Sequence, residues 1–261
     1  MSGKPSLTAA IVRPPSVSFA SGLTTVDLGP PDLALTFKQH AAYCEALQKC
    51  GLRLIRLPAD PLYPDSTFVE DTAVVTSRCA VLTRPGALSR RGEVDRIKET
   101  FDSLFAKVHV INEPGTVDGG DICEAGNHFI IKISQRTNEA GARQLTAILA
   151  QYDYTTSFVD VREIPGLLHL KSGVAYLGDN RLVLIEALAI EKEFAGYDLL
   201  IVPRDEEYAS NCVRINDTVL IAAGYPRFEK QLHQLGYQTL ALDMSEFQKM
   251  DGGLSCLSLR F

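Results

Sequence analysis

Short apolar runs come in pairs along the chain, and a tight turn of small or polar residues separates the two members of each pair. The pairs occupy residues 68–86, 117–138, 167–188 and 209–227. The turn residues are Ser77-Arg78, Gly126-Asn127, Gly178-Asp179-Asn180 and Asn216-Asp217. Asn, Asp and Gly tolerate the positive φ angles that tight hairpin turns require. Each pair therefore predicts a β-hairpin.

A helical pattern follows each hairpin, and a further strand follows each helix. The runs LTAILA (145–150) and KQLHQLG (230–236) show the apolar spacing of a helix with one buried face. The predicted helices cover residues 89–105, 138–150, 186–194 and 225–235, and the strands after them lie in 107–114, 155–162, 198–203 and 238–243. A fifth helix and strand, at 32–50 and 51–58, has no hairpin before it.

The unit strand–strand–helix–strand recurs with a period of about 40 to 50 residues, which is typical of repeat architectures. The two ends of the chain, residues 6–15 and 251–261, can supply the missing hairpin. We therefore predict a single α/β domain over residues 1–261: a five-bladed α/β-propeller of pseudo-symmetric ββαβ repeats, closed by pairing of the N- and C-terminal strands. Closure of this kind protects sheet edges. A doubly wound α/β sheet is the alternative, and the regular period disfavours it.

Composition narrows the class of protein. The chain has 261 residues, 46% of them hydrophobic, and a net charge of −6. The acidic balance argues against a nucleic-acid partner. No apolar run approaches the roughly 20 residues that span a bilayer, so no membrane partner is expected. The six cysteines form no CxxC pair, and no signal peptide is recognisable, so we expect free thiols and a cytoplasmic location. The sequence leaves a homodimer open.

A closed ring would bring the start of every blade to a shared centre. Glu70, Asp71, Asp118, His169 and Cys256 would then meet although they are far apart in the sequence. Taken singly, each is a weak signal, because a lone histidine or cysteine is more often a core residue than a catalyst. Together they form the set of groups that nucleophilic catalysis on a cationic substrate requires.

Five carboxylates lie in two of the motifs that open the blades: Asp65, Glu70, Asp71, Asp118 and Asp121. Gathered around one cavity, they would repel one another unless a cation neutralised them. A metal site would need a second nearby His or a Cys pair, and neither occurs, so we predict no metal. A planar guanidinium fits better, because carboxylates bind it through paired hydrogen bonds. Its charge would also favour the thiolate of Cys256.

Several motifs resemble those of the dimethylarginine dimethylaminohydrolases (dimethylargininases), members of the guanidine-modifying pentein superfamily. The resemblance runs in order from SGLTT (21–25) through PDSTFVED (64–71), SRRGE (89–93), GTVDGGD (115–121), SQRTN (134–138), LHLKSG (168–173) and NC (211–212) to DGGLSCLSLRF (251–261). It implies the five-bladed fold and a hydrolase that acts on the C–N bonds of linear amidines. The implied reaction converts Nω-methylated arginines (monomethylarginine and asymmetric dimethylarginine) to citrulline and methylamine or dimethylamine, through a covalent thiouronium on cysteine and with no cofactor.

The resemblance also implies roles for individual residues. Cys256 would be the nucleophile, and His169 would protonate the leaving amine and then activate water. Asp118 would orient His169, although some relatives carry Glu at this position. The implied contacts with the substrate come from Glu70, Asp71 and Phe68 at the guanidinium, from Arg90 and Arg136 at the carboxylate, and from Asp65 and the carbonyls of Leu23 and Met250 at the α-ammonium.

Two other functions stay open at this point. A deiminase that releases ammonia from free arginine, or from another small guanidine, would use the same groups. A non-catalytic amino-acid-binding protein would need no nucleophile, so the set of Cys256, His169 and Asp118 disfavours it.

Overall fold

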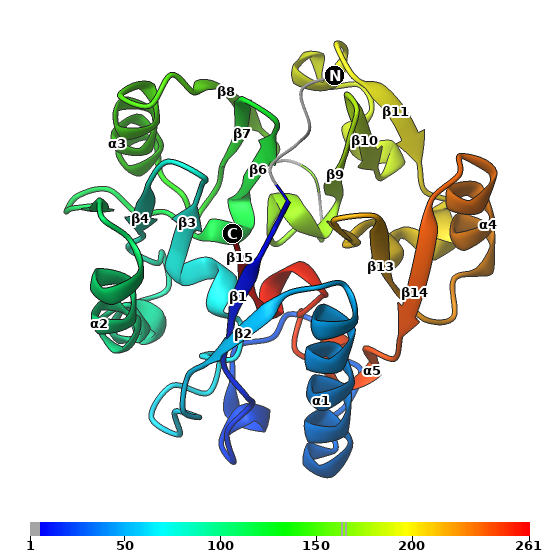
Figure 1. Cartoon of the computed structure of the whole chain (residues 1–261), viewed down its shortest axis with the longest axis horizontal. Helices are drawn as coiled ribbons and strands as arrows, with labels where there is room; N and C mark the ends of the chain where they lie inside the picture. The colour runs from blue at the N-terminus through cyan, green and yellow to red at the C-terminus, as the bar shows by residue number, and fades with distance from the viewer. Residues whose placement is uncertain (1–5, 163, 165) are drawn as a thin grey trace.

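The computed structural model describes residues 6–162, 164 and 166–261, and it arranges five three-stranded sheets around a common centre (Figure 1). The strands are β1 Ala9–Val12, β2 Arg53–Arg56, β3 Ala73–Val75, β4 Ala80–Leu82, β5 Val108–Val110, β6 Ile122–Ala125, β7 His128–Ile133, β8 Thr155–Asp160, β9 Val174–Gly178, β10 Arg181–Leu184, β11 Asp198–Ile201, β12 Val213–Ile215, β13 Thr218–Ala222, β14 Gln238–Leu242 and β15 Leu259–Arg260. The α-helices are α1 Leu33–Lys49, α2 Asp95–Leu104, α3 Glu139–Ala150, α4 Pro226–Gln234 and α5 Ser245–Gln248.

Every sheet combines an antiparallel pair of strands with a third strand that runs parallel to its middle strand. Four sheets follow chain order, namely β3-β4-β5, β6-β7-β8, β9-β10-β11 and β12-β13-β14. The fifth has the order β15-β1-β2, with Ala10 opposite Arg260 and Ile11 opposite Leu259 in its antiparallel pair. The predicted repeats and their closure by the two ends of the chain are therefore confirmed.

The middle strand of each sheet is buried on both faces. Successive side chains of a strand point to opposite faces, so one apolar run can contribute to two cores. In β7, Phe129 and Ile131 pack into the core shared with α3, whereas Ile130 packs against the sheet of β9 to β11. The same alternation recurs in β1, β4, β10 and β13. Five apolar clusters result, and each one joins two neighbouring sheets around the ring.

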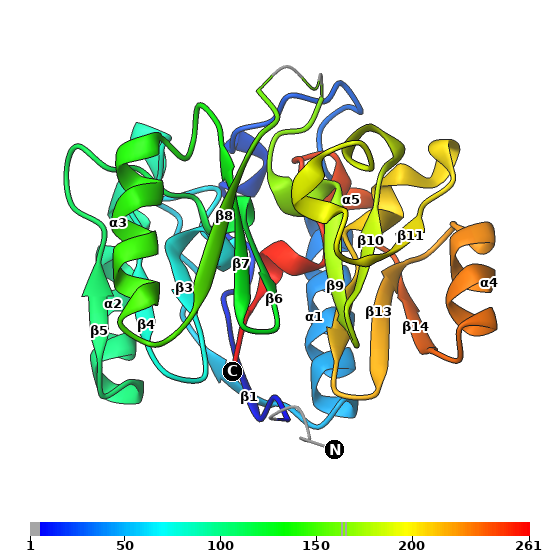
Figure 2. The ribbon, with the colours of Figure 1, turned by 90° about the horizontal axis from the view of Figure 1, so that it is seen from above.

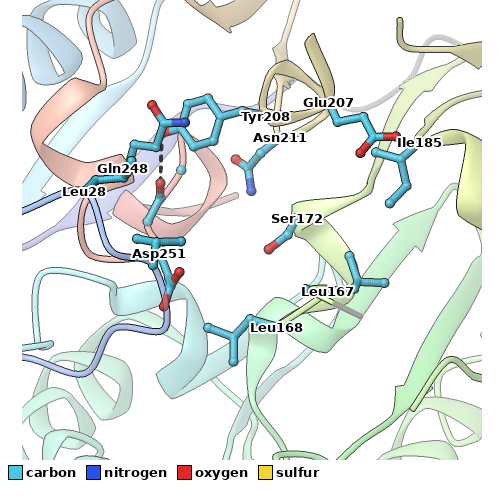
Figure 3. Close-up of a pocket in the computed structure, with 14 residues that line it drawn as sticks. Leu28, Leu167, Leu168, Ser172, Ile185, Glu207, Tyr208, Asn211, Gln248 and Asp251 are labelled. Carbon is cyan, nitrogen blue, oxygen red and sulfur yellow. Dashed lines mark hydrogen bonds between the residues drawn. The ribbon is translucent and has the colours of Figure 1, made fainter. Parts of the chain in front are cut away.

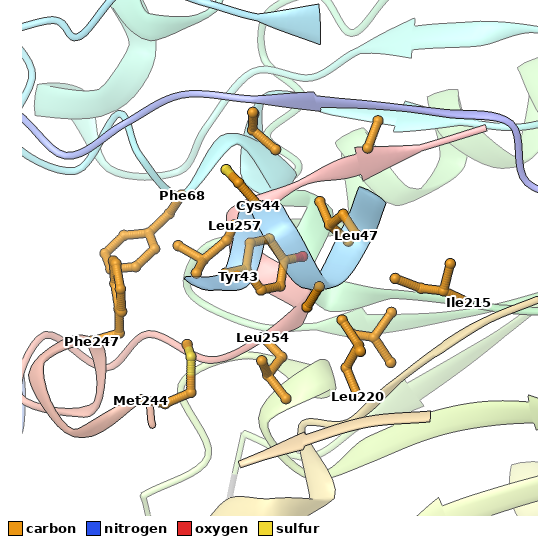
Figure 4. Close-up of a cluster of buried hydrophobic side chains, with 14 of the residues drawn as sticks. Tyr43, Cys44, Leu47, Phe68, Ile215, Leu220, Met244, Phe247, Leu254 and Leu257 are labelled. Atoms are coloured by element: carbon orange, nitrogen blue, oxygen red, sulfur yellow. The ribbon is translucent and has the colours of Figure 1, made fainter. Parts of the chain in front are cut away.

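One of these clusters joins the sheet made from both chain ends to the sheet of β12 to β14. Tyr43 and Leu47 reach into it from α1, Ile215 and Leu220 come from β12 and β13, and Leu257 comes from the segment before β15 (Figure 4). The buried hydroxyl of Tyr43 lies 2.6 Å from Oγ of Ser258. This contact ties α1 to the C-terminal segment.

The helices α1 to α4 lie on the outside of the ring (Figure 1, Figure 2). Asp32 caps α1 by accepting a hydrogen bond from the amide of Leu35, and Asn138 caps α3 by accepting one from Gly141. Within the described residues, no helix is both long and apolar enough to cross a membrane.

The helix predicted over residues 186–194 is wrong. Two short 3-10 turns, Glu186–Leu188 and Lys192–Phe194, occupy this connection instead. Leu188 and Phe194 are buried but lie six positions apart, and Ile190 between them is 86% exposed. That spacing cannot form the apolar stripe of an α-helix. The helix predicted over 89–105 is likewise divided into a 3-10 segment, Leu88–Glu93, and α2.

Gly119 allows two blades to approach closely at the centre of the ring. A Cβ atom at this position would lie 2.0 Å from the carbonyl oxygen of Glu70. We expect Gly119→Ala to lower the free energy of unfolding by about 1 to 3 kcal/mol, because rigid backbone would have to shift. Gly196→Ala is the matched control, since nothing lies within 4 Å of a Cβ there. Urea unfolding of both variants checks this, and equal midpoints would contradict the packing argument.

Candidate active site

Each blade is preceded by a short 3-10 turn, and these turns meet at the centre of the ring. They are Val69–Thr72, Gly119–Asp121, Leu170–Ser172, Arg204–Ser210 and Ser255–Leu257. Contacts link Val69–Thr72 to the turns at 119–121 and 255–257, and link Leu170–Ser172 to the turns at 119–121 and 204–210. Asn211 completes the circle, because its Oδ1 accepts a hydrogen bond of 2.8 Å from the amide of Ser255. The fold thus brings distant polar motifs together.

The His169 imidazole lies between two buried carboxylates. Its Nε2 is 3.1 Å from Oδ2 of Asp118 and 3.9 Å from Oδ1 of Asp71. Burial opposes the charge of the imidazole, but the carboxylates of Asp71, Asp118 and Asp121 outweigh burial and raise its pKa to about 9. His169 is therefore protonated at neutral pH.

Asp118 is fully buried and held from several directions. Its Oδ1 accepts a hydrogen bond of 2.8 Å from the amide of Gly86, and its own amide donates to Oγ1 of Thr137 at 3.1 Å. Nη1 of Arg136 lies 3.9 Å from Oδ2, and the Arg136 side chain keeps 21% exposure. Asp118 thus presents one fixed oxygen to His169.

Asp71 receives hydrogen bonds on both carboxylate oxygens. The amide of Gly120 donates to Oδ1 at 2.9 Å, and Nη1 of Arg90 donates to Oδ2. Burial acts against the charge, but His169 and Arg90 lower the pKa of Asp71 to about 2. A Cβ at Gly120 would lie 2.9 Å from both Asp71 Oδ1 and His169 Cγ, so only glycine fits between them.

Arg90 is buried beneath Asp71. Its guanidinium also donates to both carboxylate oxygens of Glu93, at 3.0 and 2.8 Å, and to the carbonyl of Phe68 at 3.0 Å. Burial raises the pKa of Glu93 to about 7, against the opposing effect of Arg90. The chain itself thus uses most of the donors of Arg90, and binding of a substrate carboxylate by this residue stays a prediction.

Glu70 is neutralised by the chain's own cations. Its Oε1 accepts from Nζ of Lys171 at 2.8 Å and from Nη2 of Arg260 at 3.3 Å, and its Oε2 accepts from Oγ of Ser255 at 2.7 Å. The expectation that the clustered carboxylates need a bound cation for neutrality is therefore corrected. Internal arginine and lysine side chains already balance Glu70 and Asp71.

Four residues predicted to contact the substrate lie around the segment 19–25. The Asp65 carboxylate accepts hydrogen bonds of 3.0 and 3.3 Å from the amide of Leu23, and burial raises its pKa. The Leu23 side chain is 44% exposed, whereas Met250 is buried. Phe68 packs against the rings of Phe19 and Phe247, with centroids 5.9 and 6.3 Å away.

Cys256 lies in the turn Ser255–Leu257, next to the turn that carries Glu70 and Asp71. Burial, and then the negative charges of Glu70 and Asp71, raise the pKa of its thiol to about 12. Without a ligand, Cys256 is therefore a neutral thiol.

Among the described residues, one group has suitable ligand atoms for a metal ion: Asp71, Asp118 and His169, with those atoms within 4.8 Å of one another. Hydrogen bonds from Arg90, Gly120 and Gly86 already occupy these carboxylates. The proton on His169 supplies the positive charge between them. The arrangement thus fits an imidazolium held by two carboxylates.

Two cavities lie near these groups. One of about 320 Å³ is lined by Leu168, which precedes His169, and by Gly252 and Gly253, which precede Cys256. Figure 3 shows Asn211 and Ser172 at its wall, between Asp251 on one side and Ile185 on the other. Cys256 and His169 do not themselves line this cavity; their neighbours do. A second cavity of about 770 Å³ is lined by Glu70, Lys171, Ser255 and Arg260, among others.

Comparison with known proteins identifies the family. No protein-family profile matches the chain. The chain is 46% identical over 252 residues to the N(G),N(G)-dimethylarginine dimethylaminohydrolase of Pseudomonas aeruginosa, a match that covers 96% of this chain and 98% of the relative. The protein of that name from Streptomyces coelicolor is 36% identical over 255 residues, which covers 96% of each.

The chain belongs to the dimethylarginine dimethylaminohydrolase family.

Solved structures agree with this assignment. A cysteine-to-serine variant of the Pseudomonas aeruginosa dimethylarginine dimethylaminohydrolase, complexed with citrulline, matches with a TM-score of 0.95 at 45% identity, over 98% of this chain and 100% of that one. The N-terminal domain of ArgZ, a cyanobacterial arginine dihydrolase, matches with a TM-score of 0.85 at 17% identity over 98% of this chain and 97% of that one, and so shares the fold.

Sequence reasoning missed several charged groups around the centre that the family resemblance did not single out. These are Glu93, Lys132, Lys171 and Arg260. One usable signal was present, because Lys132 stands within the otherwise apolar end of HFIIKI (128–133). A charge in a strand that is buried on both faces must have a partner nearby.

The raised pKa of His169 makes stability depend on pH. Between the ordinary pKa of 6.5 and about 9, the folded protein holds a proton that the unfolded chain releases. The contribution of His169 to the free energy of unfolding is therefore complete below pH 6.5 and is lost as pH rises through 9. We expect His169→Gln to flatten the fall in stability over this window. Urea unfolding at several pH values checks this, and parallel curves for variant and wild type would refute it.

Proposed function

We propose that the protein hydrolyses Nω-methylated arginines to citrulline and methylamine or dimethylamine. The observation that carries this proposal is the similarity, over 98% of the chain, to a solved dimethylarginine dimethylaminohydrolase that holds citrulline. The buried contact between His169 and Asp118 supports it, because a protonated, oriented imidazole is the group that must protonate a leaving amine.

Cys256 is the proposed nucleophile. Its thiol is neutral in the free protein, so a positive charge must arrive before the thiolate can form. A guanidinium bound beside Glu70 and Asp71 supplies that charge. The thiol proton passes to solvent, and the sulfur then attacks the guanidinium carbon and forms a C–S bond, which gives a neutral tetrahedral adduct.

His169 is the proposed acid and base. Nε2 is held by Asp118, so Nδ1 is the nitrogen that exchanges protons with the substrate. It protonates the amine as the C–N bond breaks, leaving a planar thiouronium on Cys256. The neutral imidazole then takes a proton from water while the hydroxyl adds to carbon. The hydroxyl proton passes to sulfur as the C–S bond breaks, which releases citrulline and restores the neutral thiol of Cys256.

The amino-acid part of the substrate is assigned to the groups that the resemblance named. Arg136 keeps an accessible side chain, which supports its role at the substrate carboxylate. Asp65 already holds the amide of Leu23, so an α-ammonium placed there would be bound together with the segment 21–25. Arg90 would contribute through its remaining donor and through Asp71.

All six cysteines are free thiols, which supports a reducing, cytoplasmic setting. The homodimer stays a prediction.

Removal of the nucleophile tests the mechanism. Cys256→Ser should lower citrulline formation from asymmetric dimethylarginine at least about 10³-fold, because no covalent intermediate can form. Cys50→Ser is the matched control, since Cys50 is the other cysteine that is not fully buried and it lies in none of the central turns. A colorimetric citrulline assay on asymmetric dimethylarginine, monomethylarginine and arginine provides the readout. Turnover of arginine alone would favour the deiminase, and binding without turnover of any of the three would favour a binding protein.

The neutral thiol predicts a charge-selective labelling pattern. At pH 7 the cationic reagent 2-chloroacetamidine should modify Cys256 much faster than Cys50, because it carries the charge that lowers the pKa of Cys256. Neutral iodoacetamide should show no such preference. Peptide mass spectrometry measures both ratios, and equal ratios for the two reagents would rule out activation of the thiol by a bound cation.

A further inference from the structure

A buried ion pair lies directly behind His169 and has no part in the proposed chemistry. Nζ of Lys132 is 3.8 Å from Oδ1 of Asp121, and the two side chains are 3% and 0% exposed. Burial raises the pKa of Asp121 and lowers that of Lys132, so burial works against both charges. Buried ion pairs contribute little net stability, because desolvation offsets their attraction. The pair therefore calls for an explanation other than stability.

Lys132 is bonded to the backbone on the N-terminal side of His169. It lies in β7, and its ammonium donates hydrogen bonds of 2.7 and 2.8 Å to the carbonyls of Leu167 and Leu168. These two residues immediately precede the histidine. The ammonium thus holds the chain that leads into His169.

Asp121 is bonded to the backbone on the C-terminal side. Its Oδ1 accepts a hydrogen bond of 3.2 Å from the amide of Leu170, and its Oδ2 accepts one of 2.7 Å from Oγ of Ser134. The pair is consequently hydrogen-bonded to the backbone on both sides of His169. The ion pair between the carboxylate and the ammonium keeps the backbone segments on the two sides of His169 at a fixed separation.

We propose that Asp121 and Lys132 act as one positioning unit, which fixes the backbone around His169 so that its imidazole stays in hydrogen-bond contact with Asp118. This inference rests on the acid–base role proposed for His169. Neither residue touches the substrate or the reacting atoms. These hydrogen bonds support a positioning role, because all three that join the side chains of the pair to the backbone involve residues within two positions of His169.

The unit also contributes charge. Asp71, Asp118 and Asp121 face His169, and Arg90, Arg136 and Lys132 lie beyond those carboxylates. The two members of the pair therefore act on His169 with opposite signs. Loss of the carboxylate should favour the neutral imidazole, whereas loss of the ammonium should not. These charges act on His169 whether or not the pair positions it, so the positioning role is tested by turnover at unchanged KM.

The test uses the full chain with Asp121→Asn, Lys132→Met and the double variant. NMR titration of the His169 imidazole in unliganded protein should show a lower pKa in Asp121→Asn and no decrease in Lys132→Met. Turnover of asymmetric dimethylarginine should fall about 10- to 100-fold in both, with little change in KM, because the imidazole is displaced but the substrate contacts remain. The double variant should be no slower than the slower single variant, since the two residues work as a unit.

Glu206→Gln is the matched control. Glu206 is a buried carboxylate that accepts hydrogen bonds from the amides of Arg227 and Phe228 at the start of α4. The Glu206→Gln substitution should lower the free energy of unfolding without changing the pKa of His169 or the pH profile of turnover. Unchanged His169 titration and turnover in folded Asp121→Asn would overturn the inference.

Two further outcomes distinguish failure of the positioning unit from failure of the proposed function. If no guanidine is hydrolysed by the wild type but the His169 titration shifts as described, the positioning unit stands and the proposed function fails. If the variants do not fold, hydrogen exchange in the wild type decides. The amide hydrogen of Leu170 should then exchange with solvent as slowly as the most protected core amides. Rapid exchange would refute its hydrogen bond to Asp121.

Discussion

Antiparallel pairing of β1 with β15 brings together the two ends of the sequence, and the geometry of the centre follows from it. The amide of Ala9 donates to the carbonyl of Phe261 at 2.8 Å, and Ile11 lies opposite Leu259. Cys256 stands three residues before this short strand, so its place in the ring is set by the same register. Arg260 belongs to the strand itself and reaches Glu70. Closure of the last blade therefore also completes the charged centre, because the C-terminal segment contributes a strand to the blade and a guanidinium to the centre.

The centre then solves an electrostatic problem with side chains of its own. Glu70 is matched by Lys171 and Arg260, Asp71 by Arg90 and His169, and Asp121 by Lys132. Each carboxylate is held by directed hydrogen bonds as well as by charge, so its orientation is set before any ligand binds. Preorganised polar groups of this kind stabilise developing charge without the cost of rearrangement. Burial, and then the nearby carboxylates of Glu70 and Asp71, keep the thiol of Cys256 protonated until a cation is added.

Much of this architecture could be predicted from the sequence, for identifiable reasons. The hairpins were visible because Gly126, Gly178 and Asn216 stand at positive φ in the turns, which few other residues tolerate. The closed ring could be predicted because no hairpin precedes the helix at 32–50, and residues 6–15 and 251–261 can supply the missing one. The connection at 186–194 was misjudged, because its composition favours a helix while only tertiary packing shows that Ile190 points to solvent.

The candidate site was less predictable than the fold. The meeting of His169 and Asp118 at the centre was anticipated, since both residues open blades in the repeat, and the family resemblance implied their direct contact. The pairing of Arg90 with Asp71 and Glu93 was not, because a sequence shows charges but not which of them share a buried volume. The resemblance named residues that could bind a substrate, and it carried no information on how many of their donors the protein uses itself.

The protonated state of Cys256 has a consequence for oxidative damage. Peroxides react with thiolates far faster than with thiols, and a sulfenic acid at Cys256 would disable the proposed nucleophile. A thiol whose pKa is raised to about 12 exposes almost no thiolate to such oxidants while the site is empty. Sensitivity to oxidation would then be confined to the interval in which a bound cation lowers the pKa of the thiol.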